Sequence, residues 1–378
     1  MHSQHQEKSS RTRTVMVDVT QHLSEIQPHH RVNLFPSFGQ LDREQGHWKI
    51  AIRGVVFEPF FDAYQDRILV RFLQRAMKAD SYSMDSDIFR QRVGVFLAQH
   101  GSGIRVAIRI GHKLYRLRRR TKRNGHFSGV LRLSVADVER MKNEGQIHSD
   151  WLNFRVVTGE GDQRRITGQA QLIRPKGVSV ISDIDDTIKR SDVPIRSELL
   201  ANTFLREYES IPGMSRLYRK GADNGVAFHY VSSSPWQLYE SLKHLCQEDR
   251  FPHGTYHLRT LRLKDPRVLS LLLPTRWGKR RTIRSILKAF PRRTFVLIGD
   301  SGERDPELYG AIAREYPGRV SRIYIRDLES RSMDSARLRK AFRGQTNNVW
   351  RLFTDADQLT TDWEELLGGP DKTTKSGF

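Results

Sequence analysis

The sequence is organised around the stretch Val178-Ser179-Val180-Ile181-Ser182-Asp183-Ile184-Asp185-Asp186-Thr187. Its first half is a short apolar run rich in β-branched residues, which predicts a buried strand. Its second half places three carboxylates within four residues. Carboxylates crowded at a strand end raise one another's pKa values unless a cation lies among them. The carboxyl edge of a parallel sheet is also where α/β proteins place their sites.

Two interpretations of this stretch are open on its own residues. In the first, the aspartates form a solvated turn or cap the N-terminus of a helix. In the second, they hold Mg²⁺ next to an aspartate that acts as a nucleophile. The rest of the chain has to decide between the two.

The composition limits the class of protein. The chain has 378 residues, enough for two or three domains. Lys and Arg outnumber Asp and Glu by 64 to 43, a net charge of +21, which favours nucleic acid, anionic membranes or phosphorylated substrates as partners. A single cysteine, Cys246, excludes an internal disulfide and fits a reducing compartment. With no apolar run near the roughly 18 residues of a membrane span, we expect a cytoplasmic protein.

The first half of the chain is predicted to be rich in β-structure. Residues 1–44 are polar and are expected to form a flexible tail. Over residues 45–174, short segments with a period of two are separated by glycine-bearing turns, which predicts an all-β sandwich or a small barrel. The expected strands include residues 48–57, 89–97 and 104–110, with a helical segment at 63–78.

One predicted hairpin in this region is unusually basic. It carries six cations in eight residues, namely Arg116, Arg118, Arg119, Arg120, Lys122 and Arg123. One interpretation is a solvated hairpin tip that protects a sheet edge from association. The other is contact with an anionic membrane surface or with nucleic acid. Nucleic acid is the less favoured partner, because only Tyr115 and Phe127 stand nearby for base stacking.

After Pro175-Lys176-Gly177 the pattern changes to alternating strands and helices. This alternation predicts a mostly parallel, doubly wound sheet over residues 175–345. The expected strands are residues 178–182, 226–231, 294–299 and 320–325. A helical segment and a tail are expected over residues 346–378.

Polar residues stand where these strands end. They are Asp183 and Asp185 after the first strand, Ser232 after the second, and Asp300 and Asp305 after the third, with Lys279 before the helix that precedes the third strand. Phosphoryl transfer through an aspartyl-phosphate needs a nucleophilic carboxylate, an acid/base, groups that hold the phosphate oxygens, and carboxylates that hold Mg²⁺. The chain supplies each of these parts in order.

These elements resemble the four motifs of the haloacid dehalogenase superfamily of Mg²⁺-dependent phosphohydrolases. The matching positions are Asp183-x-Asp185-x-Thr187, Ser232, Lys279 and Gly299-Asp300-x-x-x-x-Asp305. The longer strings at residues 182–189, 230–238 and 299–307 resemble the catalytic domain of the actin-patch-protein type of phosphatidate phosphatase. The resemblance covers about residues 176–330, and the β-rich region is similar to what precedes that domain in bacterial relatives.

The resemblance implies a role for each motif residue. Asp183 would be the nucleophile and Asp185 the general acid/base, while Ser232 and Lys279 would bind the transferring phosphoryl group. Two alternatives stay open at this point. Ser232 could instead cap the helix that follows it, and a neighbouring arginine could take the place of Lys279.

The resemblance also implies Mg²⁺ as the cofactor. Asp183, Asp300 and the main-chain carbonyl of Asp185 would hold the ion. Asp305 would be a further ligand or would support the other ligands.

The expected function is Mg²⁺-dependent hydrolysis of phosphatidate to diacylglycerol and phosphate. A cytoplasmic enzyme that attaches peripherally to membranes would fit this reaction and the positive charge. One alternative is the same chemistry on a soluble or nucleic-acid phosphomonoester. Another is a basic membrane- or nucleic-acid-binding protein whose catalytic site has lapsed.

Overall fold

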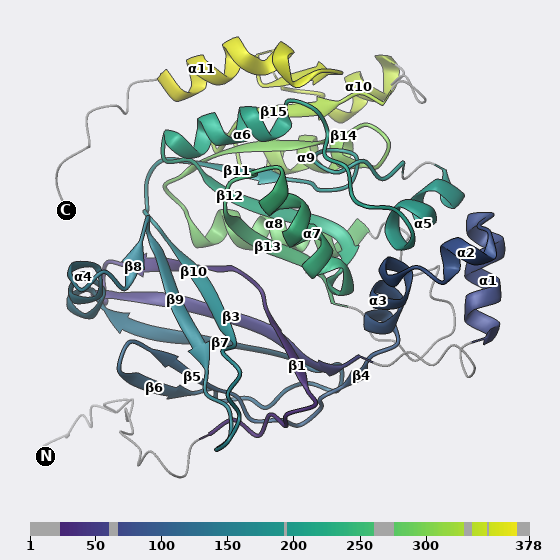
Figure 1. Cartoon of the computed structure of the whole chain (residues 1–378). Coiled ribbons are helices and arrows are strands. Elements are labelled where there is room, and N and C mark those ends of the chain that lie inside the picture. The colour runs from purple at the N-terminus through teal and green to yellow at the C-terminus, as the bar shows by residue number, and fades with distance from the viewer. Residues whose placement is uncertain are drawn as a thin grey trace, which may run out of the picture.

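The computed structural model describes residues 23–59, 67–192, 195–260, 276–328, 335–345 and 348–368. Figure 1 shows a β-rich domain at the bottom and an α/β domain above it. Among the described residues, no helix combines the length and apolar character that a membrane span requires. The residues that precede position 23, half of the expected tail, lie outside this description.

The β-rich domain is built on a ten-stranded sheet. Its strands are β1 (Arg31–Leu34), β2 (Ser37–Asp42), β3 (His47–Glu58), β4 (Gln99–His100), β5 (Ala107–Ile110), β6 (Lys113–Arg116), β7 (His126–Ser134), β8 (Ile147–His148), β9 (Trp151–Val156) and β10 (Thr167–Ile173). Residues 31–42, which we expected in a flexible tail, form β1 and β2. They are ordered because they pair with β3 and β10.

The long strand β3 organises this sheet. It pairs with β2 along its first half, with β1 along its second half, and with β7 along the opposite edge. Its side chains alternate as the period-two pattern predicts, so that Ile50 and Ile52 are fully buried in the core of the domain. The expected β-rich character is therefore confirmed.

The β-rich domain also contains helices. They are α1 (Arg67–Met77), α2 (Ser81–Met84), α3 (Asp87–Phe96) and α4 (Val135–Asn143). The strand expected at residues 89–97 was wrong, because most of this segment belongs to α3. Ser86 caps the helix by accepting a hydrogen bond from the Phe89 backbone N–H at 3.3 Å. Phe89, Val93 and Phe96 are buried at the spacing of one helix face. Over so short a segment, apolar residues at this spacing can also be taken for the alternation of a strand.

The basic stretch is not the tip of a hairpin. β6 pairs with β5, whereas β7 pairs with β3. The six cations therefore begin at the end of β6 and continue along a loop that joins two strands that do not pair with each other. We call residues 116–123 the basic loop.

The α/β domain has a six-stranded, fully parallel sheet. Its strands are β11 (Val178–Ser182), β12 (Ala227–Pro235), β13 (Gly254–Arg259), β14 (Thr294–Asp300), β15 (Val320–Arg326) and β16 (Trp350–Phe353). Their spatial order is β13-β12-β11-β14-β15-β16. The first strand therefore lies at the centre, and the direction of strand addition reverses between β11 and β14. Such a switch point opens a crevice at the carboxyl ends of the strands.

Helices cover both faces of the parallel sheet. They are α5 (Arg196–Phe204), α6 (Met214–Asp223), α7 (Tyr239–Glu248), α8 (Arg276–Ala289), α9 (Asp305–Glu315), α10 (Ser335–Ala341) and α11 (Thr360–Gly368), and short 3₁₀ helices precede α7 (Trp236–Leu238) and α11 (Ala356–Leu359). Val180 packs into the core formed with α5, α6, α7 and α11, whereas Ile181 packs into the core formed with α8, α9 and α10. The predicted doubly wound α/β fold is confirmed.

The two domains share a hydrophobic core. The Phe57 ring meets the Trp236 ring edge-on with the centroids 5.1 Å apart, and Phe35 meets Tyr239 at the same distance. The Tyr256 backbone N–H donates to the Pro36 carbonyl at 3.0 Å. In Figure 1, α3 lies beside α5 at this junction. Pro175-Lys176-Gly177 therefore joins two domains that pack closely together.

Candidate active site

The switch point brings the polar strand ends together. Ser182, the last residue of β11, is in register with Tyr230 of β12 and Ile298 of β14. The residues that follow these three positions therefore meet at one edge of the sheet. Asp183 and Asp300 are both buried there.

Asp183 occupies the centre of this edge and is only 1% exposed. Its backbone N–H donates to the Ile298 carbonyl at 2.8 Å, which ties the residue to β14. Neither carboxylate oxygen has a hydrogen bond that satisfies the geometric criteria in the described part of the chain, although Oδ1 forms an ion pair with Lys279 Nζ at 3.0 Å. Burial raises the pKa of Asp183 well above its ordinary value, although the nearby charge of Lys279 opposes this shift. The carboxylate is therefore left available for a further partner.

Lys279 is the cation of the site. Its Nζ lies 2.6 Å from Asp305 Oδ1, 3.0 Å from Asp183 Oδ1 and 3.8 Å from Glu303 Oε2. Burial alone would lower the pKa of Lys279, but Asp183 and Asp305 raise it well above its ordinary value. The neighbouring Arg280 instead pairs with Glu315, 3.4 Å away on the surface. Of these two neighbours, only the lysine is thus placed at the carboxyl edge.

Three carboxylates form a candidate metal centre. Asp183, Asp300 and Glu303 each offer one oxygen, and these oxygens lie within 4.8 Å of one another. Asp300 Oδ1 accepts hydrogen bonds from the Gly302 and Glu303 backbone N–H groups at 2.7 and 2.9 Å, while its buried Oδ2 has no partner among the described residues. Burial raises the pKa of Asp300 to about 7 and that of Glu303 to about 8, and neighbouring carboxylates add to both shifts. A cation would relieve this crowding.

Glu303 was not a candidate in the sequence analysis. Asp305 was expected as a ligand or as a support, and the structure places it against Lys279 rather than in the three-carboxylate group. The close approach of Asp305 requires glycine at position 299, since a Cβ there would lie 2.1 Å from Asp305 Oδ2. The available signal for Glu303 was its place three residues after Asp300 in the same loop.

Asp185 has a different set of partners. It accepts hydrogen bonds from Lys189 Nζ at 3.0 Å, Ser191 Oγ at 2.6 Å and Ser232 Oγ at 3.0 Å, and also from the Ser234 hydroxyl. Burial alone would raise the pKa of Asp185, but the charge of Lys189 and the hydroxyl hydrogen bonds lower it below its ordinary value. Of these four partners, the sequence analysis had named only Ser232.

Asp186 shapes the loop that follows the first two aspartates. Its backbone φ of 53° lies in the left-handed region, which is uncommon for residues other than glycine. Its Oδ1 accepts from the Ser191 and Asp192 backbone N–H groups at 2.8 and 2.9 Å. Arg326 Nη1 donates to its carbonyl at 2.9 Å. These contacts fold the loop back so that Lys189 and Ser191 reach Asp185.

The β-rich domain supports the same loop from outside. The guanidinium carbon of Arg92, on α3, lies 4.2 Å from the centre of the Tyr208 ring, and Lys189 Nζ lies 4.6 Å from it. Arg92 Nη1 also donates to the Thr203 and Arg206 carbonyls at 3.0 and 2.7 Å. Lys189 is thus held between Asp185 and an aromatic ring that a residue of the other domain contacts.

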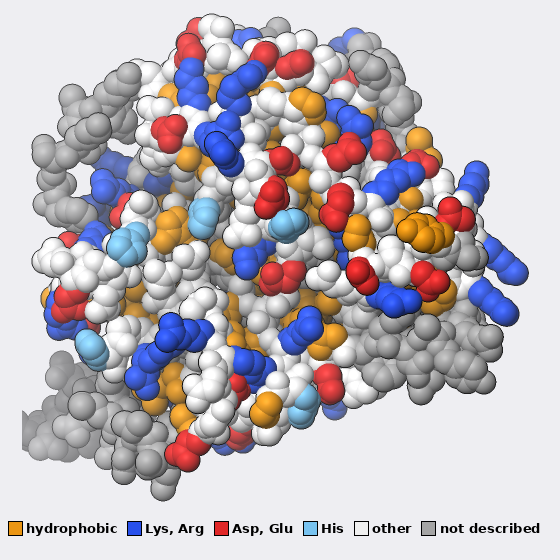
Figure 2. Space-filling view, in the orientation of Figure 1, with side chains coloured by type: hydrophobic (Ala, Val, Ile, Leu, Met, Phe, Trp, Pro, Cys, Tyr) orange, Lys and Arg blue, Asp and Glu red, His pale blue; other side chains and the backbone are white. Residues whose placement is uncertain are grey.

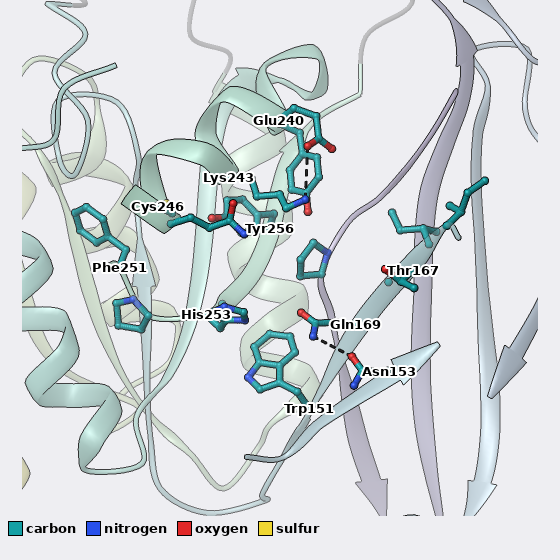
Figure 3. Close-up of a pocket in the computed structure, with 18 of the residues that line it drawn as sticks. Trp151, Asn153, Thr167, Gln169, Glu240, Lys243, Cys246, Phe251, His253 and Tyr256 are labelled. Atoms are coloured by element: carbon teal, nitrogen blue, oxygen red, sulfur yellow. Dashed lines mark hydrogen bonds and ion pairs between the residues drawn. The ribbon is translucent and has the colours of Figure 1, made fainter. Parts of the chain in front are cut away.

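A separate cavity of about 930 Å³ lies between the domains. Figure 3 shows Trp151 and Gln169 on strands of the β-rich sheet facing α7, which carries Glu240 and Lys243. None of the described residues that line it belongs to the acidic group, so this cavity is distinct from the candidate active site.

Comparison with known proteins agrees with the sequence resemblance. Residues 178–327 match the family model described as "Phosphatidate phosphatase APP1, catalytic domain". Phosphatidate phosphatase APP1 of Saccharomyces cerevisiae is 32% identical over 210 residues, which cover 54% of this chain and 35% of that protein. An uncharacterised protein of Schizosaccharomyces pombe is 32% identical over 158 residues, 41% of this chain and 26% of that protein.

The chain spans 35% of the length of the first relative and 26% of the length of the second. The predicted resemblance of residues 176–330 to this type of catalytic domain is confirmed. Among solved structures, the D,D-heptose 1,7-bisphosphate phosphatase from B. bronchiseptica, complexed with magnesium and phosphate, is 15% identical with a TM-score of 0.29. That alignment covers 49% of this chain and 98% of the other chain.

Proposed function

We propose that this chain is a Mg²⁺-dependent phosphatase that hydrolyses phosphatidate to diacylglycerol and phosphate. The observation that carries the proposal is the position of Asp183, whose carboxylate lies 3.0 Å from the Lys279 ammonium and shares a metal-sized space with Asp300 and Glu303. The match of residues 178–327 to a phosphatidate phosphatase family supports the choice of substrate.

The acidic group fits a magnesium ion. Asp183, Asp300 and Glu303 would hold it, because carboxylate oxygens are the ligands that Mg²⁺ prefers. The pKa values of these three largely buried carboxylates are all raised even with Lys279 nearby, so they need a further positive charge if they are to ionise together. When bound, the ion would supply charge neutralisation between an anionic nucleophile and an anionic ester.

In the first step, a carboxylate oxygen of Asp183 forms a bond to phosphorus and the bond from phosphorus to the glycerol oxygen breaks. Lys279 and Ser232 stabilise the negative charge of the transferring group by contacting its oxygens. The departing alkoxide takes a proton from Asp185, which gives diacylglycerol and an aspartyl-phosphate.

In the second step, Asp185 removes a proton from water while the water oxygen attacks phosphorus. The bond to Asp183 breaks, which releases phosphate and restores the free carboxylate. Lys189 and the hydroxyls of Ser191 and Ser234 favour the ionised form of Asp185, the form that this step requires. The proton gained here is the one donated to the leaving group in the next turnover.

The basic loop supports action at a membrane surface. All six cations of the loop are exposed. Arg120 also pairs with Glu25, and Lys122 also lines a cavity between the domains. On the face shown in Figure 2, Lys and Arg are spread over the surface with acidic side chains among them. We infer that the exposed arginines of the loop draw the enzyme to anionic lipid, because polybasic clusters gain about 1 kcal/mol per charge near such a surface.

A phosphate-release assay tests the proposal. It compares phosphatidate in mixed micelles with soluble glycerol 3-phosphate, each with Mg²⁺ and with EDTA. We expect Mg²⁺-dependent release that is faster from phosphatidate. Equal or greater release from the soluble ester would overturn the lipid substrate but keep the chemistry. Failure to release phosphate from either substrate would overturn the enzyme assignment and favour a binding protein.

A further inference from the structure

A second cavity between the domains has an unusual set of charges. It encloses about 140 Å³, and its lining includes Arg53, Lys122, His126, His257 and Trp236. No aspartate or glutamate is among the lining residues, all of which belong to the described part of the chain. The cavity is therefore lined by basic side chains without an acidic partner.

Arg53 is a positively charged residue of this cavity whose guanidinium is only partly hydrogen-bonded. It lies on β3, and its Nη1 donates to His257 Nδ1 at 3.2 Å across the domain interface. Its Nε and Nη2 atoms are buried and have no hydrogen-bond partner among the described residues. Burial lowers the pKa of Arg53 to about 10, so the guanidinium is still charged at neutral pH.

The neighbouring histidines cannot neutralise this charge. Because a guanidinium only donates hydrogen bonds, His257 must accept at Nδ1 and carry its proton on Nε2. That N–H donates to Thr255 Oγ1 at 2.9 Å, and the Thr255 hydroxyl donates to His229 Nδ1 at 2.7 Å. This directed chain keeps both imidazoles neutral. Burial lowers both pKa values, that of His229 to about 3. The charge of Arg53 adds to the shift of His257, and the charges of Arg293 and then Arg53 add to that of His229.

We propose that this cavity is a binding site for a small oxyanion of the phosphate class. A buried charge is costly unless it is paired, and the described residues supply no pair for Arg53. Arg53 and Lys122 together offer two positive charges, which match a phosphate dianion. The guanidinium fork can also hold two oxygens of such an ion at once. The source is either free phosphate or the phosphate of a lipid headgroup.

The position of the site gives the anion a structural effect. Trp236 forms part of the cavity and packs against Phe57 at 5.1 Å and His126 at 5.6 Å, both from the β-rich domain. It directly follows the end of β12, the strand that carries Ser232. Arg53 and Lys122 both belong to the β-rich domain, and the cavity sets them against Trp236 and His257 of the α/β domain. An anion there would neutralise the charge that Arg53 buries at the domain interface, next to the catalytic strand. Because it would bind only the folded chain, it should raise the melting temperature.

Thermal unfolding of the full chain in EDTA tests the proposal. Melting temperatures are compared with and without millimolar inorganic phosphate, with the ionic strength matched by sodium chloride. We expect phosphate to raise the melting temperature of the wild type and of the control Arg132→Met, which removes an exposed charge from the same sheet. Arg53→Met should abolish the shift, and Lys122→Met should reduce it.

Two further arms locate the site and its natural source. The rise in melting temperature with phosphate should persist in Lys279→Ala, which removes the cation of the candidate active site. If Lys279→Ala lost this rise, or if Arg53→Met kept it, the proposal would be overturned. Vesicles containing phosphatidylglycerol replace phosphate in the last arm. If vesicles raise the melting temperature, free phosphate does not, and Arg53→Met abolishes the effect of the vesicles, the natural ligand is a lipid headgroup. Protection by neither probe would overturn the site, while leaving the proposed phosphatase activity untouched.

Discussion

Lys279 Nζ lies 2.6 Å from Asp305 Oδ1, closer than it lies to any other carboxylate it contacts. Asp305 therefore holds the lysine in place, while Glu303 takes a position beside Asp183 and Asp300. In the loop after β14, Glu303 can therefore bind a metal cation, whereas Asp305 positions the ammonium group of Lys279.

The separation of tasks predicts different effects for two matched variants. Glu303→Gln should weaken Mg²⁺ binding by at least about tenfold, or about 1.4 kcal/mol, because it removes one ligand charge. Asp305→Asn should lower the turnover rate more than the Mg²⁺ affinity, because it frees Lys279 from its nearest carboxylate. Calorimetric Mg²⁺ titration alongside kcat measurement separates the two effects. The same loss of Mg²⁺ affinity in both variants would contradict this assignment.

The nucleophile is tested by Asp183→Asn, which keeps the size of the side chain. An amide cannot attack phosphorus, so we expect turnover to fall by at least about 1,000-fold, equivalent to about 4 kcal/mol of barrier. Phosphate release in saturating Mg²⁺ measures the loss, and circular dichroism checks the fold. Retention of more than a few per cent of the activity would rule out the covalent role.

Removal of the metal should destabilise the native chain. Mg²⁺ that binds only the folded state raises stability by mass action, so the wild type should melt at a higher temperature in millimolar Mg²⁺ than in EDTA. Asp300→Ala should lose most of that difference, since it removes a carboxylate of the candidate metal centre. Scanning calorimetry gives both values, and equal melting temperatures for the wild type in the two buffers would argue against the centre.

The same carboxylates predict how stability depends on pH without metal. Burial raises the folded-state pKa of Asp300 to about 7 and that of Glu303 to about 8. Carboxyl groups in the unfolded chain have pKa values of about 4, so these two groups bind protons more tightly in the folded state. Its extra stability is present below about pH 4 and is lost as the pH rises through about 7 and 8.

Because Mg²⁺ competes with those protons, the difference in melting temperature between Mg²⁺ and EDTA should grow from pH 6 to pH 9. Melting curves over this range check the trend, and Glu303→Gln should flatten its upper part. A difference that shrinks as the pH rises would contradict the protonation argument.

Two adjacent exposed arginines of the basic loop, Arg118 and Arg119, are tested as a pair. Arg118→Ser with Arg119→Ser should weaken binding to anionic vesicles by about 1 kcal/mol per charge and slow hydrolysis of vesicle-borne phosphatidate. Hydrolysis of a soluble ester should stay unchanged, because neither residue contacts the site. Arg120 is left in place because it pairs with Glu25. The matched control replaces exposed Arg132 and Arg155 of the same sheet with serine. Equal losses in the two double variants would show that only net charge matters.

The local pattern of the sequence was sufficient for the parallel sheet, and it placed the candidate site at the end of the central strand. Val178–Ser182 is apolar and β-branched, and Asp183 follows it directly, so strand and site are encoded by adjacent residues. Alternation of strands and helices then implies the doubly wound topology, since parallel strands need crossover connections. The motif spacing carried the family resemblance in the same way.

Other features depend on residues that only the tertiary structure brings together. Whether residues 89–97 form a strand or a helix depends on which face meets α5, because a run this short fits both periods. The partnership of Asp185 with Lys189 and Ser191 depends on a loop that folds back on itself.

Which of Glu303 and Asp305 lies in the candidate metal centre also depends on the tertiary structure. Both are acidic and lie two residues apart, so their types could not separate them, and only the position of Lys279 on a distant helix did. The pairing of Arg53 with His257 spans 204 residues. Sequence determined what each segment prefers locally, because propensity and periodicity act over a few residues. Tertiary structure decided which charges face one another, because electrostatic contacts form between segments that are far apart along the chain.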